Sequence, residues 1–256
     1  MRYLLHLAYK GTNYRGWQRQ LVVKTVQQTL EDTLSKLVKY KVIVVGCGRT
    51  DAGVHASNYV AHMDMKEELR LDFLFIINKM LPDDITVYST ELVADNSQAQ
   101  FHASRRRYDY YIHTKLDPSL HDVSTYYDVD QLDFTTMQSA LTMLIGRPDC
   151  KNICRQPEIN KHTYCEVSKA ALYHDGYRLQ VRIEANRFLR SMVRLVVGNV
   201  MAIGKGTLTL AEWQYILEGD TDTAHQNLAP PQGLYLSGIY YRDRVYDEAS
   251  FLSLAE

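Results

Sequence analysis

A short glycine-rich segment between two apolar stretches holds the residues of this sequence that could do chemistry. Residues 46–56 read GCGRTDAGVHA and contain Arg49, Asp51 and His55. Glycine permits close backbone approach and positive φ angles, and loops held by a sheet commonly carry reactive groups. An ionised Asp51 could act as a nucleophile or remove a proton, and a neighbouring cation would keep it ionised by lowering its pKa. The plain structural alternative is an Asx turn, in which Asp51 bonds backbone N–H groups ahead of Gly53.

The elements that must position this segment follow from hydrophobic patterning. Thr25 and Gln28 have the spacing of a capping box, which predicts a helix start. Tyr14 and Trp17, in the loop after the first strand, are expected to be exposed. The resulting order, βαββαβ, is that of the ferredoxin-like arrangement. The predicted elements are strands 2–9, 42–45, 58–63 and 85–92, a helix beginning at Thr25 and a helix over 71–80.

The rest of the chain repeats this order loosely. A hairpin is expected to turn at Asp175-Gly176, and Thr209 is expected to start an extra helix. We therefore predict an α+β fold of two ferredoxin-like halves whose sheets meet around a central cleft, with domains 1–103 and 104–256. The predicted elements are strands 107–114, 164–173, 177–184 and 233–241, helices 130–144, 187–203 and 210–217, and loops 148–160 and 220–232.

Composition limits the class of protein. The chain has 256 residues, of which 46% are apolar and 23% charged, and this excludes a disordered chain. No apolar stretch is long enough to span a membrane, and the N-terminus does not resemble a signal peptide, so we expect a cytoplasmic protein without a membrane partner. Because the net charge is −1, any nucleic-acid binding requires local clusters of cations. The candidates are Arg105–Arg107, Arg187, Arg190 and Arg194, for which a solvated face is the plain alternative.

Four residues near the middle of the chain raise the question of a metal. Cys150, Cys154, His162 and Cys165 lie close together in sequence. Their spacing lacks the paired C-x2-C pattern that is typical of zinc sites. Reduced thiols in a loop and its adjoining strand are therefore favoured over a metal site.

Five segments together resemble the tRNA pseudouridine synthase A family. They are YKGTNYRGWQRQ, GRTDAGVHA, RRRYDYYI, ANRFLRSMVRLVVGNVMAIGKG and GLYLSGIYY, and they follow the family's order over nearly the whole chain. The resemblance implies a pseudouridine synthase fold and a homodimer that acts on tRNA. It implies isomerisation of uridine to pseudouridine in the anticodon stem-loop, with neither a cofactor nor a metal.

The resemblance also implies roles for individual residues. Asp51 would be the nucleophile, attacking either the sugar or the base ring, and Arg194 would form an ion pair with it. Tyr108 would stack on the extruded target base, although Tyr110 and Tyr111 are equally plausible from the residues alone. Arg49 would help to flip the base. The implied RNA contacts are Ser97, Gln98, Ala99, Gln100, Phe101, Arg105, Arg106 and Lys161.

Two departures from the family pattern lie in these binding regions. Gln100 stands where an arginine is usual, so one cation that could contact phosphate is lost. Asp149–Ile153 replaces a typical Asp-Phe-Thr-Ser-Phe segment. Neither departure touches the Asp51 segment, so we expect them to affect RNA binding more than chemistry.

Two other functions fit parts of the sequence. A non-catalytic RNA-binding protein with tandem RRM-like modules would explain the paired halves and the tyrosines, but it would have no use for Asp51 facing phosphates. A hydrolase or metalloenzyme could be built on Asp51, His55 and the Cys/His cluster. Against this, His55 is expected to make a structural hydrogen bond within its loop.

Overall fold

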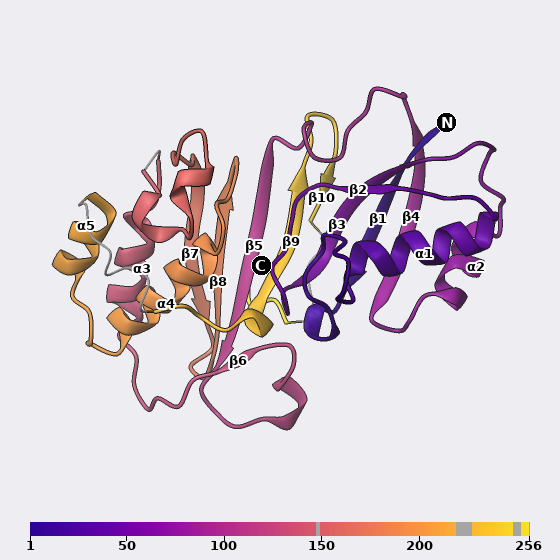
Figure 1. The fold of residues 1–256 in the computed structure, drawn as a ribbon. Coiled ribbons are helices and arrows are strands. Elements are labelled where there is room, and N and C mark those ends of the chain that lie inside the picture. The colour runs from indigo at the N-terminus through magenta and orange to yellow at the C-terminus, as the bar shows by residue number, and fades with distance from the viewer. Residues whose placement is uncertain (147–148, 219–226, 248–251, 256) are drawn as a thin grey trace. The chain divides into compact units, whose positions relative to one another are not determined.

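The computed structural model describes residues 1–146, 149–218, 227–247 and 252–255 (Figure 1). The chain forms two compact units. The first comprises Met1–Ser104 with Tyr235–Ser250, and the second comprises Arg105–Leu234 with Phe251–Glu256. The last strands of the chain therefore belong with its first hundred or so residues. The division into functional halves at residue 103 stays a prediction.

The first unit is a sheet with two α-helices. Strand β1 is antiparallel to both β3 and β4, β2 is antiparallel to the far end of β3, and β9 runs parallel to β3 at His55–Ala56. β10 extends this sheet by pairing with β9. The elements are β1 (Arg2–Tyr9), α1 (Val26–Val38), β2 (Val44–Gly46), β3 (His55–Asp64), α2 (Phe73–Met80), β4 (Ile85–Val93), β9 (Leu234–Tyr240) and β10 (Val245–Tyr246).

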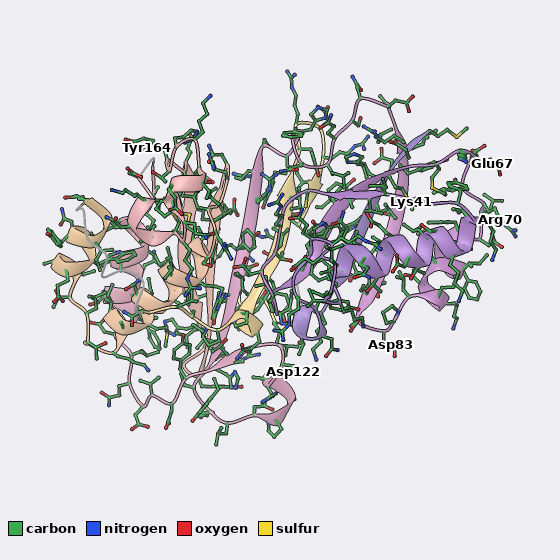
Figure 2. The ribbon with its side chains drawn as sticks, in the orientation of Figure 1. Lys41, Glu67, Arg70, Asp83, Asp122 and Tyr164 are labelled. Carbon is green, nitrogen blue, oxygen red and sulfur yellow. The ribbon has the colours of Figure 1, made fainter. Side chains whose placement is uncertain are left out.

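The core of the first unit is built from the apolar faces that the sequence pattern indicates. Leu5 and Leu7 of β1, Leu30 and Leu34 of α1, and Ile77 of α2 are fully buried, and burying such side chains contributes most of the stabilising free energy. Figure 2 shows charged side chains of this unit at the margin of the molecule, among them Glu67, Arg70 and Asp83.

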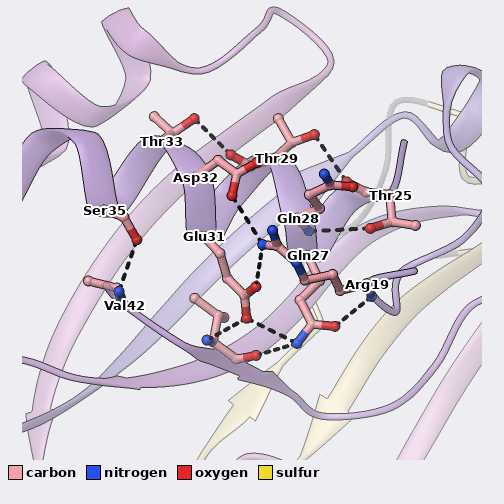
Figure 3. Close-up of polar contacts among 11 residues, drawn as sticks. Arg19, Thr25, Gln27, Gln28, Thr29, Glu31, Asp32, Thr33, Ser35 and Val42 are labelled. Carbon is pink, nitrogen blue, oxygen red and sulfur yellow. Dashed lines mark hydrogen bonds and ion pairs between the residues drawn. The ribbon is translucent and has the colours of Figure 1, made fainter. Parts of the chain in front are cut away.

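A polar network at the start of α1 fixes the chain that leads into the Asp51 segment (Figure 3). The Thr25 hydroxyl accepts a hydrogen bond from the N–H of Gln28 at 3.3 Å, which confirms the predicted helix start. The buried carboxylate of Glu31 accepts from the N–H of Val44 at 3.1 Å and from Arg19 at 3.0 Å. Because β2 begins at Val44, this carboxylate ties the entry of the Asp51 segment to the helix.

The second unit has a sheet of the order β5-β8-β7, with β6 parallel to β5. β8 is antiparallel to both of its neighbours. Helix α3 contacts α4, α5 and β7, and the Trp213 indole N–H of α5 donates to the carbonyl of Ala140 in α3 at 3.0 Å. The elements are β5 (Arg105–His113), β6 (Thr125–Tyr126), α3 (Phe134–Thr142), β7 (Val167–His174), β8 (Arg178–Ala185), α4 (Met192–Gly204) and α5 (Leu210–Glu218).

The predicted mixture of helices and a large sheet is confirmed, whereas some element boundaries are wrong. Helix α4 begins at Met192 rather than at residue 187, because Ser191 adopts a left-handed conformation with φ of 59°. The predicted turn at Asp175-Gly176 is present, with the Asp175 carboxylate accepting from the N–H of Arg178 at 2.9 Å. The expected loop 148–160 contains short 3-10 turns at Lys151–Ile153 and Pro157–Ile159. Pro148 and residues 220–226 of the second expected loop lie outside the described residues.

Each unit has an outer strand whose backbone is bonded by an amide side chain. In the first unit, Asn78 of α2 donates to the carbonyl of Val87 in β4 and accepts from its N–H, both at 2.8 Å. In the second unit, Gln138 of α3 accepts from the N–H of Leu172 in β7 at 2.8 Å and donates to a carbonyl of the same strand. These amides satisfy backbone groups that have no strand beside them.

We find no α-helix in the described parts of the chain with the length and apolar character needed to cross a membrane.

Candidate active site

The loop between β2 and β3, residues 47–54, carries Asp51 and is here called the Asp51 loop. Its residues differ in exposure: Arg49 is exposed, Thr50 is buried and Asp51 is half-buried. The turn is closed by the backbone carbonyl of Asp51, which accepts from the N–H of Val54 at 3.2 Å, and Gly53 takes a φ of 78°. The Asp51 side chain thus lies beside a tight turn with part of its surface open to solvent.

The loop after β1, residues 10–17, packs on the Asp51 loop and is here called the N-terminal loop. The N–H of Gly53 donates to the carbonyl of Tyr14, and the N–H of Trp17 donates to the carbonyl of Thr50, both at 3.2 Å. The Tyr14 hydroxyl donates to the carboxylate of Asp84, and burial chiefly, with this contact, raises the pKa of that hydroxyl.

The prediction that Tyr14 and Trp17 are exposed is wrong. Their exposed fractions are 2% and 3%; the Tyr14 ring has the ammonium of Lys24 at 4.7 Å from its centroid. The Trp17 ring stacks on that of Tyr59, with 4.1 Å between centroids. Both residues belong to the segment YKGTNYRGWQRQ, whose paired glycines and aromatics are the sequence signal for this contact.

Two glycines of the N-terminal loop allow its close approach. A Cβ on Gly11 would lie 2.0 Å from the carbonyl oxygen of Val54, and a Cβ on Gly16 would lie 2.6 Å from that of Thr50. Gly16 also has a φ of 93°, which disfavours any residue with a side chain. The contact between the two loops therefore requires glycine at both positions.

Tyr9 and His55 complete the support of the Asp51 loop. The Tyr9 hydroxyl and the Thr50 hydroxyl are hydrogen-bonded at 2.8 Å, and both residues are buried. The fully buried His55 accepts from the N–H of Gly11 through Nδ1 at 3.0 Å, and its ring stacks on Tyr235. The predicted hydrogen bond of His55 is thus structural, but the partner we see is in the N-terminal loop.

In the second unit, Arg194 occupies the first turn of α4. Every other residue of this helix is buried, whereas Arg194 is half-buried. Its Nε donates to the carbonyl of Ala229 at 2.7 Å, and its own carbonyl accepts from the N–H of Ala229 at 3.0 Å. A Cβ on Gly198 would lie 1.7 Å from the carbonyl oxygen of Asn227, so this glycine admits the segment 227–229 against the helix. The guanidinium is oriented by that segment through Nε.

The structure distinguishes the three tyrosines of β5. The Tyr110 hydroxyl donates to the carbonyl of Pro230 at 2.7 Å and bonds Thr125, and burial raises its pKa well above the ordinary value. Tyr111 is buried on the opposite face of the strand. Tyr108 packs edge-to-face on the half-buried Phe188, with 4.8 Å between centroids. The Tyr110 hydroxyl is committed to structural bonds, and the stacking role of Tyr108 stays a prediction.

The expected RNA-contact segment Ser97–Phe101 is anchored at its centre and exposed around it. Ala99 is fully buried; its N–H donates to Nδ1 of His62 at 3.2 Å, and its carbonyl accepts from the Tyr241 hydroxyl at 2.8 Å. The carbonyl of Ser97 accepts from Arg2 at 3.0 Å. The side chains of Gln98, Gln100 and Phe101 are exposed. Burial chiefly, and the charge of Arg2, lower the pKa of His62.

The arginines of β5 have partners within the second unit. Arg105 lies 3.4 Å from the carboxylate of Glu184, and Arg106 donates to the carbonyl of Asn186 at 3.3 Å. Sequence reasoning missed the buried carboxylate of Asp109, which accepts from Arg182 at 2.8 Å and 3.1 Å. Arg107 lies 3.8 Å from the same carboxylate. The spacing of Arg107 and Asp109, two residues apart on one face of β5, was the available signal.

Other cations of the second unit border the stretch that contains Lys161. Lys161 itself is exposed. Arg187 donates to Asn160 at 3.2 Å, and Arg190 donates to the side chain of Gln156. These two arginines therefore bond to side chains within residues 156–160. Lys161 and the two guanidinium groups consequently lie in one region of the unit.

The four cysteines are buried free thiols. The thiols of Cys150 and Cys165 are hydrogen-bonded; this bond raises the pKa of Cys150 and lowers that of Cys165. Burial raises the pKa of Cys154 to about 11. Within the described ranges, no group of three or more His, Cys, Asp or Glu side chains is arranged to hold a metal.

The predicted site residues are thus distributed over both units. Arg49 and Asp51 share one loop of the first unit, and Tyr108 and Arg194 belong to the second. The ion pair between Asp51 and Arg194 stays a prediction.

Comparison with known proteins gives the class. A family model described as tRNA pseudouridine synthase matches residues 140–242. The chain is 36% identical over 248 residues to tRNA pseudouridine synthase A of Parabacteroides distasonis, covering 96% of this chain and 98% of the relative. It is also 36% identical to the protein of that name from Porphyromonas gingivalis, covering 94% and 97%, and to that from a Picosynechococcus species, covering 96% and 90%.

The chain belongs to the tRNA pseudouridine synthase A family. The resemblance drawn from its five segments is therefore confirmed.

Proposed function

We propose that this protein is an isomerase that converts uridine to pseudouridine in tRNA. Membership of the family supports the reaction. The assignment of Asp51 rests on the geometry of the Asp51 loop. The half-buried Asp51 follows the buried Thr50, and backbone hydrogen bonds from the N-terminal loop hold the turn. Such fixed positioning is what a nucleophile requires.

Asp51 acts as the nucleophile in this proposal. The glycosidic bond between C1′ and N1 of the target uridine breaks, the base rotates, and a new bond forms between C1′ and C5. N1 gains a proton and C5 loses one, so the product is an isomer of the substrate. The guanidinium of Arg194 pairs with the Asp51 carboxylate.

Access to a paired or stacked uridine requires that the base leave the stack. Tyr108 receives the extruded base on its ring, and the exposed Arg49 enters the space that the base vacates. Aromatic stacking contributes about 1–3 kcal/mol per base, which offsets part of the cost of extrusion.

Further parts of the proposal concern fold and assembly. The pairing order β4-β1-β3-β2 in the first unit supports a ferredoxin-like half. The order β5-α3-β7-β8-α4 in the second unit supports a second such half. We further propose that a cytoplasmic homodimer binds the anticodon stem-loop of tRNA, with Arg105, Arg106, Lys161 and segment 97–101 contacting RNA.

The reaction is tested by release of tritium from tRNA labelled at C5 of uridine. Wild-type protein should release tritium, and Asp51→Asn, which keeps the side-chain shape without the charge, should abolish release while tRNA binding persists. Binding without release by the wild-type protein would instead support the RNA-binding alternative.

RNA binding is tested by its dependence on salt. If several cations contact phosphates, the logarithm of the binding constant should fall with that of salt concentration with a slope of several units. A flat response would contradict the proposed RNA contacts.

A further inference from the structure

Thr50, which precedes Asp51, is held by contacts that the sequence pattern does not predict. Thr50 has an exposed fraction of 7%. Its hydroxyl is bonded to the Tyr9 hydroxyl at 2.8 Å, and its carbonyl accepts from the N–H of Trp17 at 3.2 Å. The side chain and the carbonyl of Thr50 are therefore both held, and this fixes the direction of the Cα–Cβ bond of Asp51.

Tyr9 is well placed to hold this position. It is the last residue of β1 and pairs with Ala56 in β3 and with Ile85 in β4. Its ring, 4% exposed, has that of Tyr59 at 5.4 Å and that of Trp17 at 6.0 Å between centroids. The hydroxyl is thus presented to Thr50 from a residue that is paired on both sides within the sheet.

We propose that Tyr9 is a positioning residue for the reaction, acting through the Thr50 hydroxyl to set the orientation of the Asp51 carboxylate. This inference rests on the proposed function. Because a misplacement of about 1 Å can cost about 100-fold in rate, loss of the Tyr9–Thr50 bond is expected to slow the chemical step. The proposed RNA contacts include neither Tyr9 nor Thr50, both of which are buried, so binding of tRNA should change little.

Tyr9→Phe removes the hydroxyl and keeps the ring. We expect kcat for tritium release to fall by about 10- to 100-fold, with KM for tRNA within about threefold of wild type. Tyr3→Phe is the matched control, because Tyr3 lies in the same strand, is 5% exposed, and accepts through its hydroxyl from the N–H of Leu69 at 3.2 Å. Its hydroxyl has no contact with the Asp51 loop among the described contacts, so its kcat should equal that of wild type.

Thr50 supplies an independent test if Tyr9→Phe does not fold. Thr50→Val keeps the shape without the hydroxyl and should lower kcat as Tyr9→Phe does, whereas Thr50→Ser keeps the hydroxyl and should restore most of it. The double variant Tyr9→Phe/Thr50→Val should be no slower than the slower single variant, because both remove the same bond.

The outcomes separate the two claims. If the wild-type protein is active and a folded Tyr9→Phe or Thr50→Val variant has the same kcat, the positioning role is overturned and the proposed function stands. Equal losses of kcat in Tyr9→Phe and Tyr3→Phe also overturn it, because they indicate a general effect on stability. A silent wild-type protein overturns the proposed function and this inference with it.

Discussion

Gly16 is a position at which a single methyl group should disturb the Asp51 loop next to Asp51 itself. In Gly16→Ala the new Cβ would lie 2.6 Å from the carbonyl oxygen of Thr50 and 3.3 Å from the carbonyl carbon of Asp51. Both are backbone atoms, so no flexible side chain can move aside. The unfavourable φ of 93° costs about 1–3 kcal/mol, and the overpacking costs about 1–3 kcal/mol. We expect the free energy of unfolding to fall by about 2–6 kcal/mol in total.

A second glycine separates these two contributions. Gly176 has a similar φ of 101°, but no described atom lies within 4 Å of the position of its Cβ. Gly176→Ala should therefore lose only the conformational part, about 1–3 kcal/mol. Urea unfolding followed by far-UV circular dichroism measures both variants, and tritium release measures activity per folded molecule. If Gly16→Ala is no less stable than Gly176→Ala and remains fully active, the close contact between the two loops is refuted.

Three further predictions follow from other contacts. His62 accepts a hydrogen bond from the N–H of Ala99, and burial lowers its pKa. Its contribution to stability is therefore present above its unfolded pKa of about 6.5 and is lost as pH falls through the folded value. The drop in Tm between pH 7.5 and 5.5 should consequently be smaller in His62→Gln than in the wild-type protein. Asn78→Ala removes two hydrogen bonds to Val87 and should lower the free energy of unfolding by about 1–3 kcal/mol, as measured by urea denaturation. Gly198→Ala would press on the segment that orients Arg194, so if Arg194 has the proposed role kcat should fall about 10-fold or more, and an unchanged kcat in the folded variant would contradict that role.

Local features of the fold could be predicted because they depend on neighbouring residues. The cap of α1 at Thr25 and the turn at Asp175 each satisfy nearby backbone N–H groups. The start of α4 was misplaced because Ser191 enters a left-handed conformation, which an apolar sequence pattern does not reveal.

Long-range contacts of the candidate site could not be predicted. The Asp51 loop itself was found from its residue types. Its support depends on pairs far apart in sequence, such as Tyr9 with Thr50 and Tyr14 with Asp84. An aromatic residue in a glycine-containing loop has no local property that separates a solvent-exposed ring from a buried one, so Tyr14 was wrongly expected to be exposed.

The amides of Asn78 and Gln138 have a consequence for how copies of this chain can associate. An outer strand with unoccupied N–H and C=O groups can template the strand of another molecule and lead to aggregation. At Val87 both groups are already bonded by Asn78, and in β7 the N–H of Leu172 and the carbonyl of Ala170 are bonded by Gln138, so an incoming strand would have to displace an amide before it could pair. The homodimer proposed above is therefore expected to form through side-chain surfaces rather than by joining sheets at these two points.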